Sequence, residues 1–343
     1  MRLLIWGSGA IGGTLGTFFA RNGHDVTFVD SVAEHVEAIN ARGLRITGPI
    51  AEFTQRASAF TPENVTGEWD TIILATKSQH THIAMPMLAP HVSKHGGVLS
   101  AQNGLNELVI EKVVGPARTI GAFVNFGADY LEPGVIHYGG RAANVLGEID
   151  GRVTPRINAL HQMWLGFEER AIVTTNIFGF LWGKQAYGAM LFATALTNES
   201  IADALAMPRY RPVYKALARE ILAVAAARGV TPEGFDGFAP SAYLPSAPPH
   251  AADESLDGLV AHNRKSAKTH SGIWRDLAVR KRRTEVDAQL GVVVALGAEC
   301  EVPTPMTARL VALIHDIENG VREQSLATLD TLADMLPQGG TAI

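Results

Sequence analysis

The chain has 343 residues, of which 47% are apolar and 18% charged, a composition typical of a globular protein large enough for two domains. Its net charge of −5 and pI near 6.2 provide no basic surface for nucleic acid. A single cysteine, Cys300, excludes an intramolecular disulfide, and the apolar run before the first glycine is too short for a signal peptide. We therefore expect a cytoplasmic protein.

The first third of the chain alternates short apolar runs with a helical pattern. RLLIWG, DVTFVD, TIILATK, GGVLSAQNG and TIGAFVN predict buried strands, and IGGTLGTFFARNGH predicts a helix that ends at Gly23. Such runs, separated by helices, are typical of a parallel sheet covered on both faces. LEPGVIHYGGRAANVLGEID then predicts short strands and turns that close the sheet. We expect a doubly wound α/β domain over residues 1–172.

Helical spacing dominates the rest of the chain. It is present in RINALHQMWLGF, IFGFLWGKQAYGAMLFATALT, YRPVYKALAREILAVAAARG, EVDAQLGVVVALGAEC and MTARLVALIHDIENG. We expect a mostly α-helical C-terminal domain over residues 173–335, whose long apolar faces suit a homodimer. Residues 236–258 are rich in Pro, Ala and Ser, which predicts an ordered loop or a mobile lid rather than a helix.

The segment GSGAIG directly follows the first predicted strand and opens the first predicted helix. Gly7 permits a tight turn, Gly9 lets the backbone approach a pyrophosphate, and Gly12 allows the helix to pack closely on the strand. The N–H groups at the helix start attract phosphate. We therefore predict a Rossmann-like dinucleotide site, in preference to a glycine-rich turn without ligand. Its residues are Gly7, Ser8, Gly9, Ala10, Ile11 and Gly12.

Asp30 ends the second predicted strand. A carboxylate at this position binds both hydroxyls of the adenosine ribose and repels a 2′-phosphate, so we expect NAD as the cofactor and regard NADP as less favoured. Asp30 is also placed to cap the next helix, and the two roles are compatible. A flavin uses a similar glycine fingerprint, but the helical second half favours a nicotinamide enzyme.

Lys184 is the one charge in the apolar segment IFGFLWGKQAYGAMLFATALT, residues 177–197. The segment is long enough to span a membrane, but a lysine near its middle opposes insertion. Two further interpretations stay open. The lysine snorkels from a helix end with its ammonium in water, or it serves as a catalytic group in an apolar pocket, where desolvation lowers its pKa.

At this point the sequence resembles the ketopantoate reductase (2-dehydropantoate 2-reductase) family. GSGAIGG resembles the family's nucleotide fingerprint, ATKSQ its strand-end lysine motif, and QNGLNE its Asn-Gly turn. LWGKQAYGAM resembles the helix that bears the catalytic lysine, and RRTEVD the helix that bears a substrate-binding glutamate. The order and spacing of these segments cover almost the whole chain.

The resemblance implies a role for each matched residue. Lys77 and Gln79 would lie near the adenosine half of the cofactor, and Asn103 near the nicotinamide and the substrate. Lys184 would be the general acid that protonates the carbonyl oxygen as hydride arrives, and Glu285 would hold the substrate. The chemistry agrees, because an ammonium stabilises and then protonates an oxygen that gains negative charge.

Each of these roles has a structural alternative. Lys77 is equally placed to be an exposed strand-end charge. Asn103 suits a turn before a glycine. Glu285 is able to pair with Arg282 or Arg283 at the surface.

The chain departs from the family on the substrate side. The family usually carries asparagines one and two helical turns after the lysine, where this chain has Gly188 and Phe192. Of the family's serine pair only Ser271 remains, and Gly272 replaces the other member. His270 either lines the pocket or satisfies a loop hydrogen bond. We therefore count Gly188, Phe192, His270 and Ser271 as candidate substrate residues.

These observations predict an oxidoreductase that transfers hydride between NAD(H) and a small 2-oxo or 2-hydroxy acid, with ketopantoate as the family default. One alternative is an NAD-dependent dehydrogenase that oxidises a different, less polar hydroxy compound. A non-enzyme alternative is an NAD(H)-sensing regulatory protein, although Lys184 with Glu285 argues against it. The 12 histidines have no metal-ligand spacing, so we expect no metal. We also expect no membrane partner.

Overall fold

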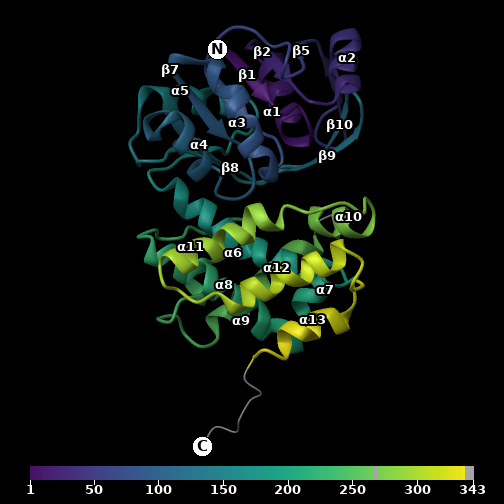
Figure 1. Cartoon of the computed structure of the whole chain (residues 1–343), viewed down its shortest axis with the longest axis vertical. Helices are drawn as coiled ribbons and strands as arrows, with labels where there is room; N and C mark the ends of the chain where they lie inside the picture. The colour runs from purple at the N-terminus through teal and green to yellow at the C-terminus, as the bar shows by residue number, and fades with distance from the viewer. Residues whose placement is uncertain (266–268, 337–343) are drawn as a thin grey trace, which may run out of the picture. The chain divides into compact units, whose positions relative to one another are not determined.

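The computed structural model describes residues 1–265 and 269–336 (Figure 1). The chain divides into two units, Met1–Ile177 and Phe178–Ile343. The first is built on β-sheets and the second is helical, so the expected α/β fold class is confirmed.

An eight-stranded sheet organises the first unit, in the order β12-β11-β8-β7-β6-β1-β2-β5. All of its neighbouring strands pair in parallel except β11 and β8, which pair antiparallel. Its strands are β1 (Arg2–Trp6), β2 (Asp25–Val29), β5 (Ser58–Phe60), β6 (Trp69–Leu74), β7 (Val92–Ser100), β8 (Thr119–Val124), β11 (Asn144–Glu148) and β12 (Ile172–Val173). The five strands predicted from apolar runs correspond to β1, β2, β6, β7 and β8. Because β1 has β2 on one side and β6 on the other, the chain leaves β1 and β6 at a topological switch point, where open α/β sheets bind ligands.

A second, four-stranded sheet was not predicted. Its order is β4-β3-β10-β9, formed by β3 (Leu44–Thr47), β4 (Phe53–Gln55), β9 (Gly127–Glu132) and β10 (Val135–Gly140). The prediction that the segment around β10 closes the main sheet is therefore wrong for β10 and right only for β11. The strands of this sheet are only three to six residues long, and β3 pairs with β10 across almost ninety residues of chain, which local pattern does not reveal.

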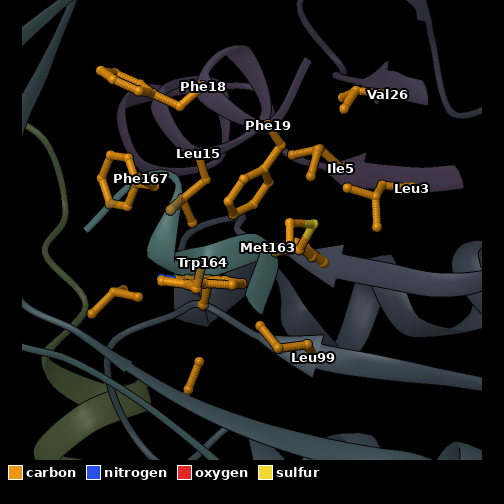
Figure 2. Packing of buried hydrophobic residues seen from close by; sticks show 14 of the residues in the cluster. Leu3, Ile5, Leu15, Phe18, Phe19, Val26, Leu99, Met163, Trp164 and Phe167 are labelled. Carbon is orange, nitrogen blue, oxygen red and sulfur yellow. The ribbon is translucent and has the colours of Figure 1, made fainter. Parts of the chain in front are cut away.

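Helices cover the main sheet of the first unit. They are α1 (Ala10–Arg21), α2 (Ala33–Arg42), α3 (Thr81–Leu88), α4 (Glu107–Val114) and α5 (Pro155–Leu165), with 3₁₀ turns at Ser78–His80, Ala89–His91 and Pro116–Arg118. Figure 2 shows Leu15 and Phe19 of α1, Trp164 of α5 and Leu3 of β1 in one apolar cluster. This packing fixes α1, and with it the glycine-rich turn that precedes α1.

The described residues of the second unit form helices and loops, with one isolated β-bridge between Phe235 and Phe238. Its helices are α6 (Ile177–Thr194), α7 (Ile201–Ala206), α8 (Arg211–Ala227), α9 (Ala251–Arg264), α10 (Gly272–Ala278), α11 (Val292–Glu299), α12 (Pro305–Glu318) and α13 (Leu326–Ala333), with a π-helical turn at Asp287–Gly291 and 3₁₀ turns at Pro208–Tyr210 and Pro240–Tyr243. Within residues 1–265 and 269–336, no helix combines the length and apolar character that a bilayer span requires.

The expectation that residues 236–258 form a loop is only partly right. Residues from Ala251 onward are the first turns of α9, whose N-terminus carries Asp253 and Glu254, where a negative charge stabilises a helix. The preceding part is anchored rather than loose, because Phe238 and Tyr243 are buried and their rings stack at 5.5 Å. Proline content alone misled the prediction, since it marks only the segment before the helix.

Candidate functional site

The glycine-rich turn after β1 has the geometry that its sequence predicts. Gly7 has φ +97°, and a Cβ there would lie 2.7 Å from the Thr76 backbone nitrogen. A Cβ on Gly12 would lie 2.0 Å from the carbonyl oxygen of Gly7. A Cβ on Gly9, by contrast, would meet no described atom within 4 Å. The outer two glycines are required by the fold, and Gly9 leaves room for a ligand.

The N-terminus of α1 suits a pyrophosphate. Gly9 is its N-cap and has no side chain to satisfy the first N–H groups of the helix. Open space above Gly9 therefore faces the positive end of a helix dipole. These features, with the switch point between β1 and β6, fit the phosphates of a dinucleotide.

Asp30 follows β2 and contacts the same turn. Its Oδ2 accepts hydrogen bonds from the Ser8 backbone N–H at 2.8 Å and from the Ser8 hydroxyl at 3.1 Å. Its Oδ1 accepts from the Val32 backbone N–H at 3.1 Å, but Val32 is itself the N-cap of α2 and no side chain caps this helix, so the capping alternative is wrong. Oδ1 keeps a second lone pair, and Asp30 is only partly buried, which leaves acceptor capacity for a ligand hydroxyl.

A second carboxylate lies in this neighbourhood. Burial raises the pKa of the Tyr130 phenol, and the negative charges of Asp30, Glu34 and Glu132 raise it further. Glu34 is in the first turn of α2. More than one negative charge therefore lies near the end of β2.

His35 was missed by the sequence reading. Its ring is fully buried, its Nδ1 accepts from the Gly134 backbone N–H at 2.9 Å, and its Nε2 therefore carries the proton that it donates to the Ser8 carbonyl at 2.9 Å. His35 thus ties the glycine-rich turn to the turn between β9 and β10. Nothing in the sequence near His35 signals this role.

Two further loops at the carboxyl edge of the main sheet are bonded to each other. The Gln102 side-chain amide, after β7, donates to the Thr76 carbonyl at 2.9 Å and to the Thr81 hydroxyl at 2.8 Å. Thr81 in turn donates to Asn106 Oδ1 at 2.8 Å. The segments ATKSQ and QNGLNE, chosen separately from the sequence, therefore form one structure.

Asn103 is held at the tip of this structure. Its carbonyl accepts from the Ser78 hydroxyl and, at 2.6 Å, from the Asn106 amide, while Gly104 follows with φ +100°. The Asn103 side chain is exposed. Both the turn role and a ligand-binding role are compatible with this arrangement.

The two residues predicted for the adenosine half differ in exposure. Lys77 is exposed, whereas Gln79 is partly buried. The side-chain oxygen of Gln79 is buried without a hydrogen-bond partner among the residues that the structure describes. A buried acceptor of this kind is suited to a ligand donor.

In the second unit, Lys184 lies on α6 and is half-buried. The backbone around Glu233 packs closely against one side of α6, where the Glu233 N–H donates to the Gly179 carbonyl at 2.9 Å. A Cβ on Gly183 would lie 2.3 Å from the Glu233 carbonyl oxygen. The glycines of this apolar segment therefore serve helix packing, and Lys184 is held on a rigid element.

Glu285 is buried, with 8% of its surface exposed, which opposes the surface-pair alternative. Arg282 pairs instead with Asp276 at 2.9 Å, and Arg283 contacts Asn319 at 3.4 Å. Glu285 does not lie within a helix, as RRTEVD suggested, but immediately before the helical segment that continues as the π-turn.

The segment that bears Glu285 is fixed to α12 by residues that the sequence reading missed. Glu318 Oε1 accepts from both the N–H and the hydroxyl of Thr284 at 2.7 Å. His315 bonds to Glu318 and to Asp287, each at 2.9 Å. Burial lowers the pKa of His315, but the hydrogen bonds to the two carboxylates outweigh it, so the net shift is upward.

A hydrogen bond joins the Lys184 and Glu285 segments. The amide of Gln185, next to Lys184, donates to the Gln289 backbone carbonyl at 2.8 Å. Gln289 lies one turn after Glu285, and its N–H donates to the Glu285 carbonyl at 3.0 Å. The structure thus brings together two predicted site segments a hundred residues apart.

The remaining substrate candidates are placed differently. Gly188 faces the Gln289 side chain, whereas Phe192 is fully buried. His270 bonds through its two ring nitrogens to Thr269 and to the Asn198 carbonyl, which favours the loop role. Ser271 is the N-cap of α10, and its hydroxyl accepts from the Trp274 N–H at 3.1 Å.

Within the described part of the chain, no group of three or more His, Cys, Asp or Glu side chains is arranged to hold a metal ion.

Two family models match the chain in succession. The model described as ketopantoate reductase PanE/ApbA matches residues 3–151, and that of its C-terminal part matches residues 176–318. A 2-dehydropantoate 2-reductase of Mesorhizobium japonicum is 27% identical over 92% of this chain and 97% of its own length. That of Pyrococcus abyssi is 28% identical over 93% and 98%.

Solved structures show the same fold. The 2-dehydropantoate 2-reductase of Geobacter metallireducens superimposes with a TM-score of 0.79 at 24% identity, covering 92% of this chain and 99% of its own. A D-mandelate dehydrogenase with NADH and anilino(oxo)acetate has a TM-score of 0.79 at 20% identity, covering 94% and 100%.

Proposed function

Because the chain belongs to the ketopantoate reductase family, a family of oxidoreductases that act on CH–OH and C=O groups with a nicotinamide cofactor, we propose that it transfers hydride between NAD(H) and a small 2-oxo or 2-hydroxy acid. The observation that carries the proposal is the bond between Gln185 and Gln289, which joins the Lys184 helix to the Glu285 segment. Ketopantoate is the family default for the substrate.

The preference for NAD rests on the end of β2. The negative charges of Asp30 and Glu34 both raise the pKa of Tyr130, so the surroundings of Asp30 carry further negative charge. Ribose hydroxyls donate to a carboxylate, whereas a 2′-phosphate is repelled by it. Lys77 and Gln79, on the neighbouring loop, are assigned to the adenosine half.

Each protein group has one task in the reaction. A reduced nicotinamide, when bound, supplies the hydride. The Lys184 ammonium stabilises the carbonyl oxygen as it gains negative charge and then donates a proton to it. In the reverse direction the neutral amine accepts that proton. The Glu285 carboxylate holds the substrate, and the Asn103 amide fixes ligands through hydrogen bonds.

The burial of Glu285 supports its proposed role in holding the substrate. A carboxylate accepts hydrogen bonds through both of its oxygens, so a substrate hydroxyl is a suitable donor to Glu285. The anchoring of the Glu285 segment through Thr284 and Glu318 keeps the carboxylate in place without the substrate.

A second candidate is a dehydrogenase of bulkier or less polar hydroxy acids. Gly188 and the burial of Phe192 favour it, because neither residue offers the substrate a hydrogen-bonding side chain. The same fold, in a D-mandelate dehydrogenase, is associated with NADH and anilino(oxo)acetate.

The third candidate, an NAD(H)-sensing regulator, requires no proton donor. The half-buried Lys184 and the buried Glu285 argue against it.

The test is a screen that follows NADH and NADPH absorbance with a panel of 2-oxo acids, and NAD⁺ and NADP⁺ with the matching 2-hydroxy acids. We expect turnover with at least one oxo acid and higher catalytic efficiency with NADH. Turnover with no carbonyl or hydroxyl compound would leave the regulator as the explanation. Highest efficiency with ketopantoate would favour the family default over the second candidate.

A further inference from the structure

Glu285 lies between two residues that are bonded to the end of α12. Thr284, directly before it, donates through its N–H and its hydroxyl to Glu318 Oε1, both at 2.7 Å. Asp287, two residues after it, bonds through Oδ1 to His315 Nε2 at 2.9 Å. His315 Nδ1 bonds in turn to Glu318 Oε2 at 2.9 Å. The two α12 residues therefore hold the chain on both sides of the proposed substrate-binding carboxylate.

The two bonds of His315 coexist in only one protonation state. A carboxylate only accepts hydrogen bonds, and a neutral imidazole carries a single N–H. His315 therefore bonds to Asp287 and Glu318 together only when both of its ring nitrogens are protonated. Loss of one proton leaves a nitrogen lone pair facing a carboxylate oxygen at 2.9 Å, where the two repel each other. One of the two bonds must then break.

The exposure of the two partners determines which bond is lost. The side chain of Glu318 is 1% exposed, and that of Asp287 is 70% exposed. A buried carboxylate that loses its donor is not solvated, whereas an exposed one exchanges that donor for water. The neutral ring therefore keeps its N–H on Glu318 and releases Asp287. Because Asp287 is the first residue of the π-turn, the chain just after Glu285 loses its attachment to α12.

The charge of this ring is controlled by the same two carboxylates. Burial lowers the pKa of His315, while Glu318 and Asp287 raise it, and the net shift is upward from 6.5. No other charged group near α12 contributes to that shift. The described charged groups on α12 and beside or packed against it are Arg309, Asp316 and Arg322, Arg283 and Glu285 before the π-turn, Arg211, Lys215, Arg219 and Glu220 of α8, and Asp330 of α13. His315 therefore stays protonated to a higher pH than an ordinary histidine.

We propose that His315 is a positioning residue that, when protonated, fixes Glu285 for the substrate, so that 2-oxo acids bind more tightly to the charged form. The inference rests on the proposed function, in which Glu285 holds the substrate, and it adds control of that site by pH. His315 acts through Asp287 on binding and not on the proton transfer from Lys184. KM should therefore follow the ionisation of His315, whereas kcat should not.

The test replaces Asp287 in two ways, at a position exposed enough to tolerate both. Asparagine either accepts or donates a hydrogen bond, so it lets a neutral His315 keep both of its bonds, whereas alanine removes one bond at every pH. KM for ketopantoate and for benzoylformate is measured between about pH 5.5 and 8.5. Over this range KM of the wild-type protein should rise roughly 3- to 10-fold relative to KM of Asp287→Asn, the usual worth of one hydrogen bond.

Asp287→Ala should have the raised KM at every pH, and kcat should have the same pH dependence in all the proteins. Titration of Lys184 is common to them and cancels in the ratio of KM values. The control is Asp334→Asn, the same loss of one charge at an exposed position after α13, which should keep the wild-type profile. Identical KM profiles in the wild-type protein and Asp287→Asn, or a wild-type KM for Asp287→Ala at low pH, would overturn the role of His315.

Binding is also measured without turnover, by calorimetry of each oxo acid with NAD⁺, a pair that cannot exchange hydride. Tighter binding at low pH that is lost in Asp287→Ala and becomes independent of pH in Asp287→Asn supports the role of His315 even if neither acid is reduced. That result would contradict only the proposed function. Binding with one pH dependence in all the proteins would overturn only the role of His315, and no binding by either acid would overturn both.

Discussion

The two units differ in what fixes their functional residues. In the first unit the backbone conformation fixes the glycine-rich turn, because Gly7 has φ +97° and Gly12 has no room for a Cβ. In the second unit, Lys184 and Glu285 depend on contacts between distant segments, such as the bond from Gln185 to the Gln289 carbonyl. The comparison teaches that local backbone geometry restricts which residues fit the glycine-rich turn, whereas Lys184 and Glu285 are positioned by packing between segments that are distant in sequence.

Replacing the proposed general acid should give the largest effect, confined to the chemistry of the second unit. Lys184→Ala should lower kcat by about 10²-fold or more, the usual worth of a positioned acid. NAD affinity, measured by fluorescence titration, should change little. Lys112→Ala, at an exposed position of α4, is the control. Turnover close to that of the wild-type protein would remove Lys184 from the mechanism.

The glutamate should act on substrate binding more than on the chemical step. Glu285→Ala should raise KM roughly 10- to 100-fold, since hydrogen bonds to charged groups are worth about 1.5–3 kcal/mol. Steady-state kinetics with the best oxo acid measures this. If KM and kcat both stay unchanged, Glu285 serves only the packing of its segment.

Replacing Asp30 tests the functional residues of the first unit, because the change should alter only the choice between NADH and NADPH. Asp30→Ser removes the charge that opposes a 2′-phosphate and should shift the ratio of NADH to NADPH efficiency by roughly tenfold toward NADPH. The substrate KM should not change. Asp25→Ser, at the opposite end of β2, is the matched control. Equal use of both cofactors by the wild-type protein would show that Asp30 serves mainly to hold the glycine-rich turn.

The space at Gly188 should set substrate size. The wild-type protein is expected to use an oxo acid bulkier than ketopantoate, such as benzoylformate, with higher efficiency than ketopantoate itself. Gly188→Leu should lower the efficiency with benzoylformate about tenfold and affect pyruvate less, because pocket volume discriminates by that order. Parallel losses with both acids would place the space outside the substrate pocket.

The smallest effect should be on the pH dependence of stability, through His315, which helps to hold the segment that bears Glu285. The pKa of His315 is raised in the folded chain above its ordinary value of 6.5. Its contribution to stability is therefore present below that value and is lost as the pH rises through the folded pKa. Between about pH 5.5 and 8.5, Tm of the wild-type protein should fall about 2 °C further than Tm of His315→Gln, as expected for roughly 1 kcal/mol. Equal pH dependence in the two proteins would contradict this.

Much of the first unit was predictable because each prediction followed from adjacent residues. The glycines after β1, the aspartate after β2 and the strands β1, β2, β6, β7 and β8 all have local signals. The pairing of the second sheet has none, since β3 and β10 are distant in sequence and meet only in the folded chain. His35 was missed for the same reason, because both of its hydrogen-bond partners are distant in sequence.

In the second unit the sequence located helices but not their mutual contacts. Lys184 stood out as the one charge in an apolar segment, the family resemblance gave roles to Lys184 and Glu285, and Gly188 was noted only as a departure. Glu318 and Gln289 gave no signal, because their roles depend on which side chain faces them across the fold. The helix α9 was hidden by the proline-rich residues before it.

The π-turn at Asp287–Gly291 has a consequence for the numbering of this region. A π-turn holds one residue more than an α-turn, so the chain before it is rotated by about 100° relative to a straight continuation of α11. Glu285 lies just before this turn. A relative with an unbroken α-helix here would need one residue fewer between its glutamate and this helix to present the same face. Roles transferred across this turn by counting residues would therefore fall one position away from the side chains that perform them.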